Sequence, residues 1–194
     1  GDVYKRQGTD HDKKLKLAVD YLKYLGSSDL SPSQKLEEFY KLGCDVSVTC
    51  SSEKTDIILT GLTQKFNQSV ALFEDILANV VADEEALINL KQNEIKKRND
   101  TKLDKQVILW RAMGNYARFG KSSSFTNVLS NEEIKDISSG ELLSIIKNLT
   151  TFKHKITYYG PMGINDVVSN LEDLHVNKEN LKELPIRKEF DELS

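Results

Sequence analysis

The sequence predicts an α+β fold in which helices cover an antiparallel sheet. The fold is expected to be helix-rich and incomplete at its N-terminal end. Two strand-like segments, 44–50 and 54–60, are joined by the short polar link 51–53, as in an antiparallel hairpin. Most of the remaining chain has the apolar spacing of helices. With one later strand, the sheet would have three strands under six or more helices, which is few for a stable antiparallel sheet. We therefore expect that the first strands are missing.

Composition fits a globular protein and excludes some classes of partner. The chain has 194 residues, of which 39% are hydrophobic and 29% charged. Its net charge of −3 gives no reason to expect a nucleic acid or an anionic membrane as partner. The apolar runs are far too short to span a bilayer. Cys44 and Cys50 would sit about 20 Å apart on one strand, too far for a disulfide, so we expect two small buried thiols.

The first residues and the first helix differ sharply in pattern. Residues 1–8, GDVYKRQG, lack periodicity and are typical of a sequencing-library adapter or a disordered terminus, so we leave them out of the fold. Residues 16–26 then predict a helix that is apolar over more than half its surface and stopped by Gly26. This helix should lie inside the domain.

The next elements follow from caps and periodicity. Ser31, Pro32 and Gln34 predict a helix start, with Leu36, Phe39, Tyr40 and Leu42 as its apolar face. After the hairpin, apolar residues recur at steps of four, three, four and three, which is a strong helix signal. They are Phe66, Val70, Phe73, Leu77 and Val80.

The second half predicts more helices and one strand. Asp83 should cap a helix over 84–99, and a second helix over 102–119 should pack through Leu103, Val107, Trp110 and Gly114. Short helices should start at Ser130 and at Ser138 or Ser139. Residues 155–160 predict a third strand and 165–174 a helix, and 175–194 look like a linker.

These elements divide the chain into three parts. Residues 1–8 are a tail, 9–152 form a domain that lacks its first strands, and 153–194 supply a strand, a helix and a linker at the start of a following domain. His11, His154 and His175 lie on three different elements, so we expect surface or packing roles rather than metal binding. Trp110, Tyr116 and Phe119 could line a groove, but helix packing is favoured.

Several segments together resemble the insulinase/pitrilysin family of zinc metallopeptidases. They are KLGCDVSV at the hairpin, SGELLSIIKNLTTFKHKITYYGP, and residues 17–26. In active members the helix matching 17–26 carries H-x-x-E-H, two zinc ligands and a general base. The best-matching positions here are Asp20, Lys23 and Tyr24, so both histidines and the base are replaced. The nearest match to the family's third ligand is Glu94, 74 positions after Asp20, and one Glu cannot hold zinc.

The resemblance implies the non-catalytic half of such a peptidase, present as a truncated fragment with an incomplete insulinase/pitrilysin-type domain. It would complete the peptide-binding chamber and contact extended substrate by strand addition. No catalytic residue, cofactor site or metal site is expected in this chain, and zinc is expected in a homologous catalytic half, in the same chain or a partner subunit. A core-subunit-like scaffold without proteolytic role and a helical partner-binding adaptor are the alternatives. The compartment stays open, and a soluble protein in the periplasm, or elsewhere outside the cytoplasm of a bacterium, is one option.

Overall fold

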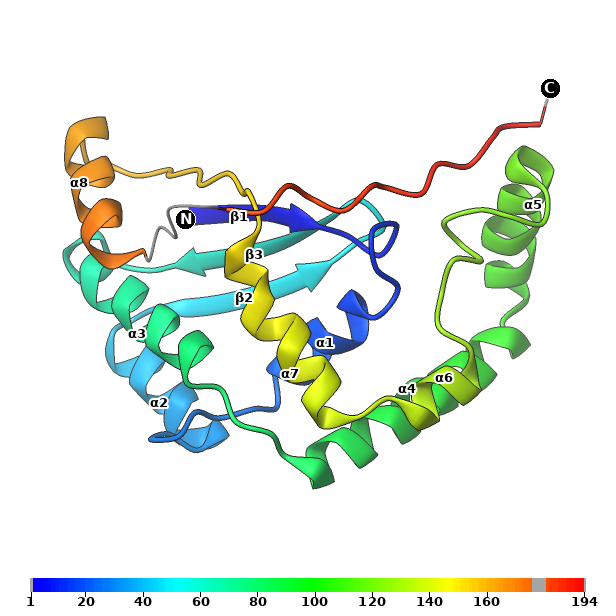
Figure 1. The fold of residues 1–194 in the computed structure, drawn as a ribbon, viewed down its shortest axis with the longest axis horizontal. Helices are drawn as coiled ribbons and strands as arrows, with labels where there is room; N and C mark the ends of the chain where they lie inside the picture. Colours follow the sequence, from blue (N-terminus) through cyan, green and yellow to red (C-terminus); the bar gives the residue numbers. More distant parts are fainter. Residues whose placement is uncertain (1, 176–180, 194) are drawn as a thin grey trace.

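The computed structural model describes residues 2–175 and 181–193, and the side chains from residue 7 onward. Most of the helices lie on one side of a small sheet, and a helical arm extends away from it (Figure 1). In chain order the elements are β1 (Asp2–Gln7), α1 (Leu15–Leu22), α2 (Pro32–Lys41), β2 (Asp45–Cys50), β3 (Lys54–Thr60), η1 (Thr63–Lys65), α3 (Phe66–Ala78), α4 (Glu84–Leu103), η2 (Val107–Met113), α5 (Gly114–Phe119), α6 (Asn131–Asp136), α7 (Ser139–Asn148), η3 (Leu149–Thr151) and α8 (Ile164–Leu174). The helix-rich α+β fold class is confirmed.

The sheet has the strand order β1-β3-β2, with both pairs antiparallel. The β2–β3 hairpin is the one that the sequence predicted, and it pairs Val46 with Leu59 and Val48 with Ile57. Its buried face holds Cys44, Val48, Ile57 and Leu59, as the alternation of apolar residues indicated. Cys50, also expected to be a buried thiol, is only partly buried.

Two predictions about the other strands were wrong. Residues 2–7 are not outside the fold, because they form β1 and pair with β3 along its whole length, Tyr4 opposite Ile57. Residues 155–160, which were expected to be the third strand, form no strand of the described sheet. The third strand of this sheet is β1 instead. A ladder of backbone hydrogen bonds needs no particular side chains, which is why the aperiodic β1 escaped prediction.

Helix α1 lies at the centre of the core, between the sheet and α7. In Figure 1 it lies below the sheet together with α2, α3 and α7. Its Leu15, Ala18 and Tyr21 are fully buried, as the apolar pattern predicted. The Tyr21 hydroxyl donates to the backbone oxygen of Asp83 at 2.8 Å and accepts from its backbone nitrogen at 2.9 Å. This pair of bonds fixes the start of α4 to α1.

The predicted helix caps are present. Ser31 and Gln34 form a capping box on α2, and Ser130 and Glu133 form one on α6. Asp83 caps α4 by accepting from the backbone nitrogen of Ala86. These contacts lie within four residues of sequence, which explains why they could be read from it.

Some predicted apolar faces are in fact exposed. On α2 only Phe39 is buried from its expected face, whereas Leu36 is 67% and Tyr40 84% exposed. The predicted helix over 102–119 is broken at Asp104, which ends α4 in an extended conformation. Trp110, expected to pack, is 72% exposed on the π-helical η2.

The last elements lie against the rest of the chain. Asn67 of α3 donates to Asn170 of α8 at 3.0 Å. The backbone nitrogen of Lys188 donates to the backbone oxygen of Asp10 at 2.9 Å. No helix in the described part of the chain is both long enough and apolar enough to cross a membrane.

Candidate functional site: the α1–α4 face and the β2 groove

The face that α1 turns toward α4 is closed by ion pairs. Lys16 and Asp20, one helical turn apart on α1, line a cavity of about 70 Å³ with Glu94 and Arg98 of α4. Nζ of Lys16 lies 2.6 Å from Oδ2 of Asp20, and Nε of Arg98 lies 3.1 Å from Oε1 of Glu94. The structure therefore brings Asp20 and Glu94 to one cavity, and each carboxylate already has a cation.

The charges on this face stabilise one another. Burial alone would raise the pKa of Asp20, but the hydrogen bonds from Lys16 and Lys23 outweigh it and lower this pKa. Burial alone would lower the pKa of Lys16, but its hydrogen bond to Asp20 and the attraction of that carboxylate raise it. Both groups are thus held in their charged forms.

The other two motif positions do not face this cavity. Lys23 follows the last residue of α1 and reaches back to Asp20 at 2.7 Å. Tyr24 lies beyond the helix, half exposed, beside the first turns of α4. Within α1, the pair four residues apart that does line the cavity is Lys16 with Asp20. Sequence matching identified only Asp20 of these, because the end of α1 at Leu22 could not be read from the residue pattern.

The side chains on this face do not fit a zinc ion. Zinc is bound in proteins by thiolates, imidazoles and carboxylates, with at least three protein ligands. The cavity offers only the two carboxylates Asp20 and Glu94, and three cations, Lys13, Lys16 and Arg98, line it with them. Among the residues that the structure describes, no three His, Cys, Asp or Glu side chains are grouped to hold a metal.

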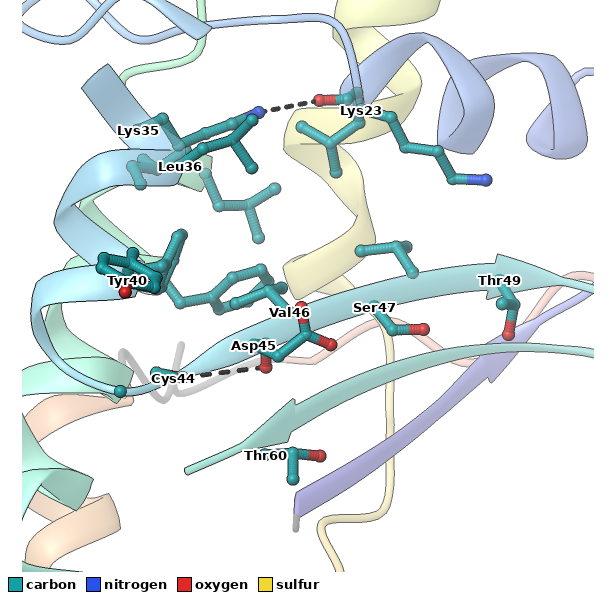
Figure 2. Close-up of a pocket in the computed structure, with 17 residues that line it drawn as sticks. Lys23, Lys35, Leu36, Tyr40, Cys44, Asp45, Val46, Ser47, Thr49 and Thr60 are labelled. Carbon is teal, nitrogen blue, oxygen red and sulfur yellow. Dashed lines mark hydrogen bonds between the residues drawn. The ribbon is translucent and has the colours of Figure 1, made fainter. Parts of the chain in front are cut away.

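A larger concave site lies between α2 and β2 (Figure 2). This groove has a volume of about 660 Å³. Its lining is largely apolar, with Phe39, Phe73 and Leu77 buried and with Leu36 and Tyr40 exposed on α2. Sequence analysis missed the groove because it read Leu36 and Tyr40 as core residues, although an apolar residue on a helix can equally serve a binding surface.

One side of the groove is a free strand edge. In the described sheet β2 pairs with β3 alone, so the backbone groups on its other side are outside any ladder. The residues of β2 from Asp45 to Thr49 all line the groove. An edge of this kind beside apolar pockets is the arrangement that accepts an added extended strand.

A buried cation stands at the helical end of the groove. Lys35 is buried, and its Nζ donates to the backbone oxygens of Leu22 and Leu25 at the end of α1, at 3.3 and 2.5 Å. Burial lowers the pKa of this ammonium group. The contact satisfies carbonyl groups that the end of α1 leaves open and so fixes α2 to α1.

Two of the histidines that sequence analysis placed apart are in contact. Nε2 of His154 lies 2.8 Å from Nε2 of His175, and Nδ1 of His175 lies 2.7 Å from Oε1 of Glu74. His11 is elsewhere, where its Nδ1 accepts from the backbone nitrogen of Gly8. His175 thus meets His154, which is 21 positions away in the sequence, and Glu74, which is 101 positions away. No local sequence pattern marks such contacts.

The helical arm carries an exposed apolar face. This η2–α5 face consists of large side chains that are all at least 44% exposed: Ile108, Leu109, Trp110, Met113 and Tyr116. A monomeric protein seldom exposes so many neighbouring apolar side chains, which makes the face a candidate contact for another domain.

Comparison with known proteins gives a fold but no sequence match. No protein-family model and no curated protein sequence matches the chain. Solved structures do match it over nearly all of its length. The periplasmic protease PqqL from Escherichia coli matches 99% of the chain at 14% identity and a TM-score of 0.73, and a protease from Helicobacter pylori matches 99% at 12% identity and a TM-score of 0.75. The peptidase M16 inactive domain from Pseudomonas fluorescens matches 96% at 13% identity and a TM-score of 0.73.

The chain spans only part of each of these proteins. It corresponds to 22% of the PqqL chain and to 48% of the chains from Helicobacter pylori and Pseudomonas fluorescens. At identities this low the similarity establishes the fold alone. The chain therefore has the fold of a peptidase M16 domain, which is the fold that its resemblance to the insulinase/pitrilysin family predicted.

Proposed function

We propose that this chain is a non-catalytic domain of a zinc-dependent, insulinase/pitrilysin-type peptidase and helps to complete its peptide-binding chamber. One observation carries the proposal: the α1–α4 face, where the family's motif would supply ligands, is filled by the Lys16–Asp20 and Arg98–Glu94 ion pairs. The fold is that of a peptidase domain, but this face offers no imidazole and no free carboxylate. A structural role follows.

The β2 groove is the part of the chain that would contact substrate. An extended peptide adds to the free edge of β2 through backbone hydrogen bonds, and its alternate side chains enter the apolar groove beside Leu36 and Tyr40. Apolar side chains on α2 that point to solvent rather than to the core support this role.

Catalysis would come from a homologous half, in the same chain or in a partner subunit, and the zinc ion would be bound there. The matched proteases are longer than this chain, which leaves room for such a half. The exposed η2–α5 face is a surface that another domain could cover. One matched protease is periplasmic, which favours a location outside the cytoplasm.

Peptide binding by the isolated chain tests the proposal. A fluorescein-labelled, unstructured peptide of about ten residues with alternating apolar side chains is long enough to pair along the six residues of β2. Fluorescence anisotropy should show saturable binding that Leu36→Glu or Tyr40→Glu weakens at least about tenfold, because each places a charge in the apolar groove.

Leu109→Glu is the matched control, since Leu109 is also an exposed apolar residue but lies on η2, away from the groove. It should leave peptide affinity unchanged. A scaffold without a peptide-binding role predicts no saturable binding, or equal binding by all four proteins, and either result would overturn the proposal.

A further inference from the structure

A buried ammonium group lies in the wall of the β2 groove. Lys35 of α2 is only 8% exposed, and it lines the groove. Figure 2 shows its side chain reaching from α2 toward the end of α1, across the groove from Val46 and Ser47 of β2. A ligand that fills the groove from the edge of β2 would therefore meet this group on the opposite side.

The hydrogen bonds of Lys35 balance its charge only in part. Its Nζ donates to the backbone oxygens of Leu22 and Leu25 at 3.3 and 2.5 Å. An ammonium group has three N–H donors, and these contacts use two of them. The carbonyl groups at the end of a helix together carry only about half of an elementary negative charge. Lys35 therefore keeps a net positive charge, and the described contacts leave one of its N–H donors for a ligand.

The other charged side chains of the groove do not neutralise Lys35. Among the described residues that line the groove, only Asp45 has a carboxylate, and Figure 2 shows it on the strand side, away from Lys35. Lys23 is a second cation, and it binds Asp20 at 2.7 Å. Burial, rather than a neighbouring charge, lowers the pKa of the Lys35 ammonium group. A buried charge is unfavourable without an opposite charge beside it, so the groove lacks an anion at this point.

We propose that Lys35 selects a glutamate side chain in the peptide that binds along β2. This inference rests on the peptide-binding function proposed for the groove. A peptide added to the edge of β2 directs alternate side chains toward the groove, and Lys35 lies across from that edge. A side chain rather than the peptide backbone thus reaches the ammonium group. Glutamate is favoured over aspartate because its carboxylate extends further from the backbone.

The selection is strong because the ammonium group is already buried and held in place. The free energy needed to remove it from water is supplied when the chain folds, since Lys35 is buried in the chain alone. A carboxylate that enters the groove loses only its own hydration, and it gains a charge-assisted hydrogen bond from a fixed donor. A glutamine has nearly the same shape but no charge. Comparing glutamate with glutamine therefore isolates the contribution of the charge.

The test measures the affinity of paired peptides for the 194-residue chain by fluorescence anisotropy. The parent is the labelled peptide with alternating apolar side chains, amidated at its C-terminus. Each apolar position in turn is replaced by glutamate in one peptide and by glutamine in its partner. At one of these positions the glutamate peptide should bind at least about tenfold more tightly than its glutamine partner. At the intervening polar positions, which point away from the groove, the two should bind equally.

Substitutions in the chain identify the group that recognises the charge. Lys35→Met keeps an apolar stem and removes the ammonium group, so it should reduce the preference for glutamate to less than about twofold. Lys35→Gln, which can still donate to a carbonyl oxygen of α1, should do the same. Lys23→Met is the matched control, because it makes the same change at another lysine of the groove lining, and it should leave the preference unchanged. Thermal melts check that each variant is folded.

The outcomes separate this inference from the function on which it rests. If no peptide binds saturably, the peptide-binding function fails and the inference fails with it. If peptides bind but glutamate and glutamine are equal at every position of the unchanged chain, only the role of Lys35 is overturned. A preference that persists in the folded Lys35 variants, or that Lys23→Met abolishes, overturns it as well.

A last pair of peptides tests the other source of a carboxylate. The parent peptide with a free C-terminus is compared with its amidated form. The two should bind the unchanged chain equally, because Lys35 lies to the side of the peptide backbone. Tighter binding of the free C-terminus, with no position that prefers glutamate, would show that the groove reads the end of a peptide, and the proposal would be wrong.

Discussion

Oδ2 of Asp20 lies 2.6 Å from Nζ of Lys16, one turn earlier on α1, at the face where α1 meets Glu94 of α4. The same carboxylate also accepts from Lys23 at 2.7 Å. The carboxylate of Asp20, which lines the cavity between α1 and α4, is thus bound by two cations, Lys16 from inside the cavity lining and Lys23 from outside it. This relationship makes the face a structural contact and gives the first two predictions.

The first prediction concerns metal. Because Asp20 and Glu94 are each bound to a cation, the chain should bind zinc no better than a non-specific surface site. Isothermal titration at neutral pH should detect no site of sub-micromolar affinity. The triple variant Lys16→His, Asp20→His, Arg98→Ala supplies two imidazoles and frees Glu94, so it should bind at least about tenfold more tightly. A single sub-micromolar site in the unchanged chain would falsify the prediction.

The second prediction concerns acid stability. The pKa of Asp20 is lowered in the folded chain, so the contribution of this carboxylate is fully present above the usual value of about 3.9 and is lost as pH falls below it. Asp20→Asn should reduce stability at pH 7 by about 1 kcal/mol, since the pair is partly exposed to solvent. Urea unfolding at several pH values should show the two proteins converging toward pH 3. A constant difference across that range would contradict the assignment.

The third prediction concerns the core. Phe73 is 4% exposed and lies mid-stripe on α3, where it also forms part of the base of the β2 groove. Phe73→Ala should lower the free energy of unfolding by about 3–5 kcal/mol. Tyr40→Ala, on the exposed side of the same groove, should change it by no more than about 0.5 kcal/mol. Equal denaturation midpoints for the two variants would mean that the burial of α3 is wrongly assigned.

The caps of α2 and α6 were read correctly from the sequence, whereas contacts between distant elements were not. The boxes at Ser31 and Ser130 are closed by hydrogen bonds within three residues, so the sequence alone contains all the partners. Leu36 has the helical spacing of a core residue, and only the position of β2 decides that it lines a groove instead. Helix spacing shows which residues share a face but not what that face meets.

The candidate site could be predicted only in its chemistry. The residues at the motif positions could be read from the sequence, and the α1 residues that line the cavity with Glu94 are Lys16, Leu17 and Asp20. Which positions face α4 depended on where α1 ends, and the helix stops at Leu22 rather than at Gly26. The contact between His154 and His175 depends on the path of α8, which no pattern in 153–175 specifies.

The last prediction concerns the edges of the sheet. β1 covers one side of β3, but β2 leaves its outer backbone groups outside any described ladder, next to an apolar groove. Such an edge favours association with another chain. The purified 194-residue chain should therefore self-associate or melt at low temperature. Thr49→Lys should reduce association, because a lysine on an edge strand opposes pairing, while Asn99→Lys adds the same charge on α4 and should not.

Removing residues 1–7 should increase association, because it uncovers β3 as well. The measurements are size-exclusion chromatography with light scattering and a thermal melt. If the 194-residue chain runs as a sharp monomer and melts cooperatively, the edge of β2 is already protected.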